Sequence, residues 1–320
     1  MNDRSGNDAL TRRQLLKSAG AGVIALGAAS CLPSTKIIRV VEQCPPAPEP
    51  SFPPLALAEA PPGDTHQQVA GQTSVVPKLR IGELIPGLYG HDAFVKEVAF
   101  TFDYMPKPGF TQRALRWLGA QQVQATFFVV GKLVQRYPGL LQQIVEAGHE
   151  LGNHTYTHPN LGALPAAEIA EELDRTQEIV DQVLGQHTPM RLVRPPYGAP
   201  FYGSARPSTI EKVSRVIAER KSCLVLWTLP TGDTRPACSP EKLIRSLKQN
   251  FVTGSGGIMV FHPTVCASQS LRRVIRIVRH KAFRVRLARE LVEEKYGMPL
   301  DELAEWAPKL LPATPTNAGR

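Results

Sequence analysis

Two histidines spaced four residues apart are the first feature of the sequence that could do chemistry. His154 and His158 stand in the segment HTYTH, and one helical turn would place both rings on the same side. Two imidazoles on one side can share a divalent metal ion. On spacing alone, two solvent-facing or hydrogen-bonded histidines explain the pair equally well.

A carboxylate and a guanidinium form a second candidate pair. Asp103 ends the apolar run 98–102, and a carboxylate that leaves a buried strand into a polar pocket can act as a general base. Arg194 is followed by two prolines in RPPYG, and it could hold a carboxylate such as Asp103 in place. Taken singly, Asp103 could be a turn or cap residue and Arg194 a partner in a structural ion pair.

A third pair consists of His262 and Asp233. His262 closes the apolar run 257–261 and precedes a proline, so a helix is not expected to begin there at once. A histidine at a strand end can protonate a leaving amine if a carboxylate orients its other nitrogen. Asp233, in TGDT, is the candidate for that carboxylate, although an Asx turn is its ordinary use.

These residues need a scaffold, and the sequence between residues 97 and 261 alternates strand-like apolar runs with helical patterns. Strict alternation predicts parallel strands joined by right-handed crossovers, and therefore a barrel or a doubly wound sheet. The strands are predicted at 97–102, 124–130, 150–152, 191–193, 223–229 and 257–261, and the helices at 112–119, 132–147, 165–184, 209–220 and 240–251.

The polar residues decide between the two architectures. Asp103, His154, Arg194, Asp233 and His262 each fall at or just after the C-terminal end of a different predicted strand, as in the active site of a barrel. A doubly wound sheet would place a glycine-rich phosphate turn after a strand, and the sequence has none. We therefore predict an α/β fold of the irregular (β/α) barrel type.

The motifs VAFTFD, ATFFVVG, EAGHELGNHTYTH, RPPYG, VLWTLPTGD and IMVFH occur in this order. Together they resemble polysaccharide deacetylases of the chitin and peptidoglycan deacetylase type, over about residues 95–263. The resemblance implies a distorted (β/α) barrel and a divalent metal, usually zinc, that activates water toward an N-acetyl group. It also implies an amino-sugar polymer as the substrate: peptidoglycan, poly-N-acetylglucosamine or a chitin-like chain.

The resemblance assigns roles to the residues that match the family motifs. Asp103 corresponds to the catalytic base, and Arg194 to the residue that positions it. His262 corresponds to the catalytic acid, and Asp233 to the carboxylate that tunes it. Tyr197 corresponds to the tyrosine whose backbone N–H stabilises the oxyanion.

The metal site departs from the family pattern. His154 and His158 correspond to two metal ligands, but Tyr104 stands where most relatives carry an aspartate as the third. A phenol ionises with a pKa near 10, so it is a poor replacement for a carboxylate. The resemblance therefore leaves two functions open: a metal-dependent deacetylase with a weakened zinc site, or a catalytically impaired relative that binds envelope carbohydrate.

The N-terminal segment predicts export. Arg12 and Arg13 precede a short apolar run that ends in small residues, a pattern that resembles a twin-arginine signal. Cys31 follows those small residues and resembles the lipidated cysteine of a bacterial lipoprotein, so lipid anchoring and plain signal cleavage are both open. We expect the protein in the periplasm or cell envelope.

Four segments follow from these patterns. They are a signal segment at 1–31, a proline-rich tether and lead-in at 32–94, the deacetylase domain at 95–285, and a helical, polar tail at 286–320. The net charge of +9 favours anionic partners, and the export signal argues against nucleic acid. Some of the cysteines beyond Cys31 could pair in an oxidising envelope, but the sequence does not give their connectivity.

Overall fold

The computed structural model describes residues 85–310. The signal segment, Cys31 and the proline-rich tether that the sequence predicts therefore lie outside the described residues. Within the described part, no helix is long and apolar enough to cross a membrane.

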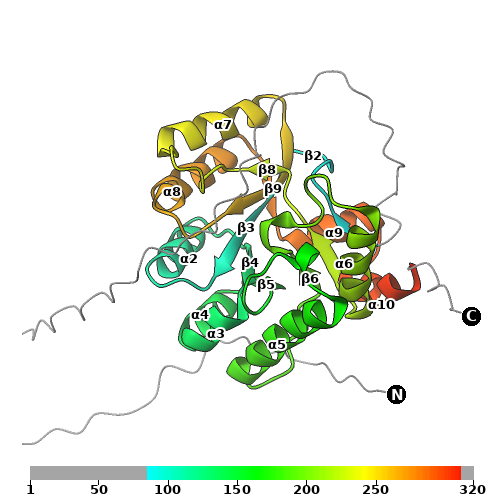
Figure 1. Ribbon diagram of the computed structural model, residues 1–320. Helices are drawn as coiled ribbons and strands as arrows, with labels where there is room; N and C mark the ends of the chain where they lie inside the picture. Colours follow the sequence, from blue (N-terminus) through cyan, green and yellow to red (C-terminus); the bar gives the residue numbers. More distant parts are fainter. Residues whose placement is uncertain (1–84, 311–320) are drawn as a thin grey trace, which may run out of the picture. The chain divides into compact units, whose positions relative to one another are not determined.

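A curved, mostly parallel sheet forms the centre of the described part (Figure 1). Its strand order is β1-β7-β6-β5-β4-β3-β9-β2, with β10 paired to β3 and β8 paired to β9; among these pairs only β2 and β9 are antiparallel. The strands are β1 Gly87–Leu88, β2 Phe94–Val95, β3 Glu97–Met105, β4 Thr126–Val129, β5 Glu150–Asn153, β6 Leu192–Val193, β7 Cys223–Val225, β8 Leu229–Pro230, β9 Ser255–Phe261 and β10 Arg284–Arg286.

Helices follow most of the parallel strands and surround the sheet, which confirms the predicted irregular (β/α) barrel. In Figure 1, α7 and α8 lie together at one end of the sheet, and α3, α4 and α5 lie at the other. The helices are α2 Phe110–Ala120, α3 Gly131–Arg136, α4 Pro138–Glu146, α5 Ala166–Leu184, α6 Pro207–Glu219, α7 Pro240–Val252, α8 Val265–His280, α9 Ala288–Tyr296 and α10 Leu300–Trp306.

Two predicted elements differ from the structure for local reasons. The helix expected over 132–147 is two helices, because Pro138 begins α4 and cannot donate the hydrogen bond that would continue α3. The strand expected over 223–229 is also divided, into β7 and β8. β7 pairs with β6, whereas β8 pairs with β9.

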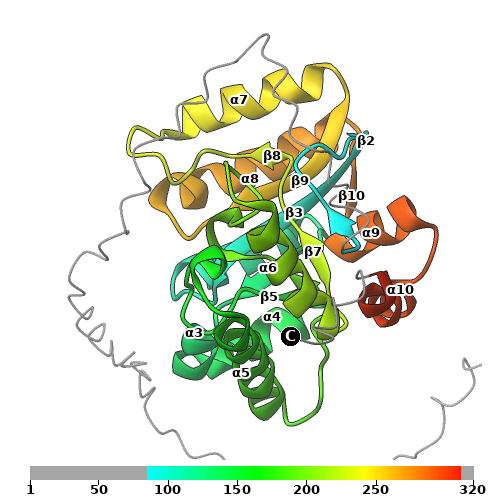
Figure 2. The same cartoon turned by 45° about the vertical axis from the view of Figure 1, so that its right-hand side comes forward.

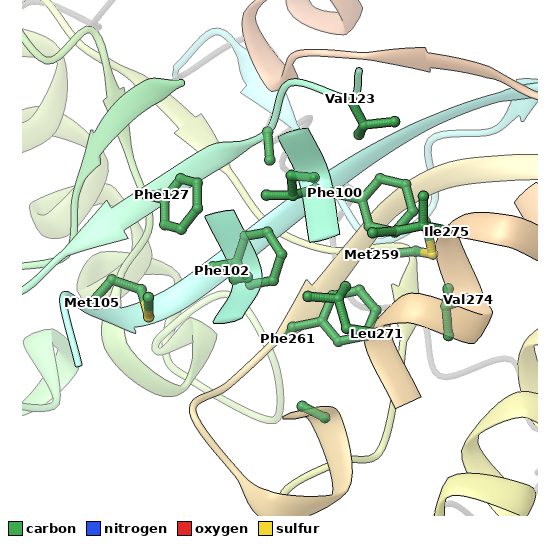
Figure 3. Close-up of a cluster of buried hydrophobic side chains, with 14 of the residues drawn as sticks. Phe100, Phe102, Met105, Val123, Phe127, Met259, Phe261, Leu271, Val274 and Ile275 are labelled. Carbon is green, nitrogen blue, oxygen red and sulfur yellow. The ribbon is translucent and has the colours of Figure 1, made fainter. Parts of the chain in front are cut away.

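The main core lies between the central strands and α2, α4, α7 and α8. Strand alternation in β3 directs Phe100 and Phe102 into this core. Phe102 stacks on Phe127 of β4, with ring centroids 4.8 Å apart, and on Phe261 of β9 at 5.6 Å. Figure 3 shows these rings together with Leu271, one of the α8 side chains that cover them.

The C-terminal helices are built into the same domain. Apolar side chains of α9 and α10, among them Leu291 and Leu303, pack with Leu88 and Ile258 in a second buried cluster. Figure 2 shows both helices along one flank of the sheet. Residues 286–310, which we assigned to a tail, therefore contribute to the core.

Candidate active site

A bulge in β3 presents two consecutive side chains to the catalytic end of the sheet. The pairing of β3 with β4 shifts register between Phe102 and Met105, and Tyr104 has a positive φ of 61°. Regular alternation would send Asp103 and Tyr104 to opposite faces, whereas a bulge can re-aim one of them. β3 extends to Met105, so Asp103 lies inside this strand, whereas the sequence predicted a strand that ends at residue 102.

Arg194 holds Asp103 in place, as the resemblance implied. Arg194 Nη1 donates to Asp103 Oδ1 at 2.6 Å and to Thr101 Oγ1 at 2.7 Å. Thr101 and Asp103 lie on one face of β3 because they are two residues apart. Arg194 Nε and Nη2 donate to the carbonyls of Val225 and Leu226, so this fully buried guanidinium is well supplied with acceptors.

His154 and His158 do come together, but not through a helical turn as predicted. Their ring centroids are 4.9 Å apart. The chain between them is an irregular loop in which Thr155 and His158 both have positive φ, 69° and 67°. Because a right-handed helix needs negative φ, the positive φ of Thr155 prevents a helical turn between the two histidines.

The side chains of Asn153, Thr155 and Glu172 hold this loop in shape. Asn153 Oδ1 accepts from the Thr155 N–H at 2.9 Å, and Thr155 Oγ1 accepts from the His158 N–H at 3.1 Å. Glu172, from α5, accepts from the backbone N–H groups of Tyr156 and Thr157. These bonds satisfy the backbone of a strained loop and fix both imidazoles.

Both imidazoles of the pair are neutral at pH 7. Burial lowers the pKa of His154, and it lowers the pKa of His158 to about 3. His154 Nδ1 lies 2.6 Å from the Arg194 carbonyl, so Nδ1 carries the hydrogen and Nε2 keeps its lone pair. A neutral imidazole with a free lone pair is the form that binds a metal ion.

Asp233 orients His262, again as the resemblance implied. The Asp233 carboxylate accepts from the backbone N–H of His262 at 2.6 Å, and its other oxygen lies 3.0 Å from His262 Nδ1. His262 Nδ1 therefore carries a hydrogen. Burial alone would lower the pKa of His262, but the hydrogen bond and charge of Asp233 outweigh burial and raise it.

Asp103 Oδ2 lies near a ring nitrogen of His154 and a ring nitrogen of His262. It lies 4.0 Å from His154 Nε2 and 4.0 Å from His262 Nε2. Burial alone would raise the pKa of Asp103, but the charge and hydrogen bond of Arg194 outweigh it, with a smaller contribution from His262, and hold the pKa below its ordinary value. Asp103 is therefore ionised and His262 is poised to be protonated, the states required of a base and an acid.

Tyr197 lies beside the histidine pair. Its ring centroid is 4.9 Å from that of His158, and its backbone has a φ of 61° in the turn after Arg194. The structure thus brings all seven predicted site residues to the same end of the sheet. Sequence reasoning missed Thr101, although it stands inside the motif VAFTFD, and Glu172, whose position carries no motif. Strand alternation from Asp103 could have indicated Thr101.

The residues present do not complete a three-ligand metal site. In the described part, no three His, Cys, Asp or Glu side chains form a cluster that could hold a metal ion. Tyr104 contacts His158, but burial raises the pKa of its phenol, which opposes the anionic form that would bind a metal. His154 and His158 fit a divalent ion held by two protein ligands, one fewer than catalytic zinc sites ordinarily supply.

The fold and the arrangement of the site fit the polysaccharide deacetylase family, and comparison with known proteins agrees. The family model for polysaccharide deacetylase matches residues 92–213. The chain is 32% identical over 223 residues to the uncharacterized protein YlxY of Bacillus subtilis, covering 69% of this chain and 66% of that protein. It is 32% identical over 168 residues to a peptidoglycan-N-acetylglucosamine deacetylase of Bacillus cereus, covering 52% and 56%.

Among solved structures, the chain is similar to a CE4 family pseudoenzyme from Bacillus anthracis. The TM-score is 0.56 at 27% identity, covering 65% of this chain and 69% of that one. A mutant of that pseudoenzyme, described as having restored enzymatic activity, matches with the same TM-score. The chain belongs to the polysaccharide deacetylase family. It spans 66% of the length of YlxY and 56% of the length of the Bacillus cereus deacetylase.

Proposed function

We propose that this protein removes N-acetyl groups from an amino-sugar polymer of the cell envelope, such as peptidoglycan, poly-N-acetylglucosamine or a chitin-like chain. The observation that carries the proposal is the pair of supported catalytic groups. Arg194 keeps Asp103 ionised, and Asp233 favours the protonated form of His262. Opposite pKa shifts on two neighbouring groups are the pattern of an assigned base and acid.

The chemistry follows from these two states. Asp103 Oδ2 accepts a proton from the water that attacks the acetyl carbonyl carbon. The backbone N–H of Tyr197 donates to the oxyanion that forms. His262 Nε2–H then gives its proton to the amide nitrogen as the carbon–nitrogen bond breaks. The products are acetate and the free amine of the sugar.

The cofactor in this proposal is a divalent ion such as zinc, for which His154 and His158 would supply two imidazole ligands. Such an ion would polarise the acetyl carbonyl and lower the pKa of the attacking water. Because a carboxylate is missing at Tyr104, we expect a lower metal affinity than that of a three-ligand site.

Tyr104 also favours a second candidate function. The protein would keep the cleft and bind the polymer without efficient hydrolysis, as a catalytically impaired envelope protein. The incomplete donor set supports this candidate, as does the structural similarity to a protein described as a pseudoenzyme. The two candidates share a substrate class and differ in turnover.

The place of action is a further part of the proposal. The pair Arg12 and Arg13, with the apolar run after it, supports export through the twin-arginine route to the periplasm or envelope. Lipid attachment at Cys31 and simple cleavage of the signal are the two alternatives for the exported form.

One experiment separates the two candidates. Purified protein is assayed for bound zinc and for acetate release from N-acetylated oligosaccharides of peptidoglycan, poly-N-acetylglucosamine and chitin. Acetate release that a chelator abolishes and zinc restores supports the deacetylase. Binding of an oligosaccharide with no acetate release, with or without zinc, supports the impaired protein. Neither binding nor release would overturn both.

A further inference from the structure

The positive charge of the protein is concentrated on three neighbouring helices. Helices α2, α7 and α8 carry nine arginine and lysine side chains and a single acidic one, Glu241, a net charge of +8 in a chain whose total is +9. All nine basic side chains belong to exposed residues. We call the arginines and lysines of α2, α7 and α8 together the basic face.

The three helices present these charges on one continuous surface. α8 lies between α7 and α2 (Figure 1). On one side of α8, Arg273 Nη1 lies 3.4 Å from Glu241 Oε1 of α7. On the other side, the guanidinium of Arg272 lies over the ring of Trp117 of α2, at 4.8 Å from its centroid. The exposed sides of the three helices are therefore joined, and the basic face extends across all of them.

The charges on α8 are not balanced within the helix. Its buried side chains pack in the main core, and Arg272, Arg276 and Arg279 form a row on the opposite side, because they are spaced four and three residues apart. Like charges at these spacings destabilise a helix, and α8 contains no acidic residue to offset them. Among the described residues, the pair Arg273–Glu241 is the only ion pair of the basic face.

An ordinary solvated surface does not account for this distribution, because such a surface mixes both signs of charge. α9 does mix them, with Arg289 and Lys295 among three glutamates. α5 carries six acidic residues and one arginine, and Figure 1 shows it at the other end of the sheet from α7 and α8. The domain thus has a basic end and an acidic end, and a negatively charged surface would orient it with the basic face inward.

We propose that the basic face binds the surface of a membrane that contains anionic phospholipids. Clusters of about four to eight lysines and arginines on an amphipathic helix are typical of binding to anionic lipid headgroups. The charges of the basic face spread over three helices lying side by side, so they match a plane of headgroups. A single strand of an anionic polymer would contact only one row of them.

The other side chains of these helices agree with binding at the headgroup level. Apart from Val252 and Val265 at helix ends, no large apolar side chain of α2, α7 or α8 is exposed, so the contact is electrostatic and does not require insertion. Single-stranded nucleic acid is ordinarily bound on exposed aromatic side chains. In the described part, none of the exposed aromatic side chains belongs to these three helices.

Sedimentation with vesicles tests the proposal. Full-length protein carrying Cys31→Ser, so that no lipid can be attached, is mixed with vesicles of equal parts of phosphatidylglycerol and phosphatidylethanolamine, or of phosphatidylcholine alone. We expect stronger binding to the anionic vesicles, and loss of this preference at high sodium chloride, because salt screens exposed charges. Equal binding to both kinds of vesicle, or binding to neither, would overturn the proposal.

A triple variant shows whether the basic face makes the contact. Arg245→Gln/Arg276→Gln/Arg279→Gln removes three charges whose side chains form no hydrogen bond or ion pair with another described residue, so the fold should be unchanged. This variant should bind the anionic vesicles about 10²-fold more weakly. Arg116→Gln/Lys248→Gln is the alternative if the triple variant folds poorly, and it should weaken binding about tenfold or more.

The matched control removes three exposed basic residues outside the basic face, in Lys132→Gln/Arg175→Gln/Arg206→Gln. It has the same net charge and the same N-terminal segment as the first triple variant, and it should keep most of the affinity. Equal weakening in both triple variants would show that total charge, and not the basic face, determines binding. Binding of soluble polyphosphate by a protein that ignores the anionic vesicles would identify a polymer as the partner. Either result would contradict the proposal.

Discussion

The ring of Tyr104 packs edge-on against the ring of His158, with the two centroids 4.9 Å apart. An aspartate at this position would instead place an anionic oxygen beside the two imidazoles. We predict that Tyr104→Asp binds zinc more tightly than wild type and releases acetate at an equal or higher rate. Calorimetric zinc titration and the acetate assay measure the two effects.

Tyr104→Phe is the matched control, because it removes only the phenol oxygen. It should bind zinc as wild type does if the phenol is not a ligand. The opposite outcome would be that wild type binds zinc tightly and that both Tyr104→Phe and Tyr104→Asp bind it more weakly. This outcome would identify the phenol as the third ligand and contradict our account of the site.

Removing the base or the acid should abolish most of the turnover. We expect Asp103→Asn and His262→Ala each to lower the rate of acetate release by about 10² or more, since positioned proton transfer contributes about 10²–10⁴. Asp103→Asn also leaves the buried Arg194 charge without its carboxylate, which should cost about 3 kcal/mol of stability. Rates are therefore compared at a temperature where circular dichroism shows both variants folded. Wild-type turnover in either would remove that residue from its role.

The pH dependence of kcat/KM should depend on the contact between His262 and Asp233. In the proposed reaction His262 acts as the acid while it is protonated, so kcat/KM should fall as pH rises through its pKa, which lies above the ordinary 6.5. The Asp233→Asn variant loses the carboxylate charge that raises the pKa of His262, while burial still lowers that pKa. The fall of kcat/KM at alkaline pH should therefore begin at lower pH in this variant. A limb that stays in place would show that another group sets it.

The disulfide between Cys238 and Cys266 should stabilise the fold and the position of His262, the acid of the proposed reaction. It closes a loop of 28 residues, and Asp233 and His262 each lie within five residues of one of its cysteines. Chain-entropy estimates for such a loop give about 3–4 kcal/mol. We expect Cys238→Ala/Cys266→Ala to unfold at correspondingly lower denaturant concentration, measured against wild type with and without reductant. Equal midpoints for the variant and oxidised wild type would refute this contribution.

Export should depend on the arginine pair. Changing both Arg12 and Arg13 to Lys should keep the precursor in the cytoplasm, because the twin-arginine route reads this pair. Cell fractionation and immunoblotting of the wild-type and double-variant proteins check the prediction. Normal export of the variant would indicate an ordinary signal peptide.

The sequence by itself determined the fold class and indicated seven candidate site residues. Strand-like apolar runs that alternate with helical patterns predicted the central strands β3, β4, β5, β6, β7 and β9 and the helices between them. Ordered motifs marked Asp103, His154, Arg194, Asp233 and His262. These features are local, since each depends on a few consecutive residues and their periodicity. The absence of a carboxylate at Tyr104 was likewise visible in the sequence.

Only the tertiary structure decided how these residues meet. The bulge in β3 turns Tyr104 toward His158, and a loop held by Glu172 of α5 replaces the helical turn we expected between the histidines. The pairing of Cys238 with Cys266 was likewise absent from any local pattern. Each of these features depends on groups far apart in the chain, and their geometry is set by packing, which periodicity along the sequence does not encode.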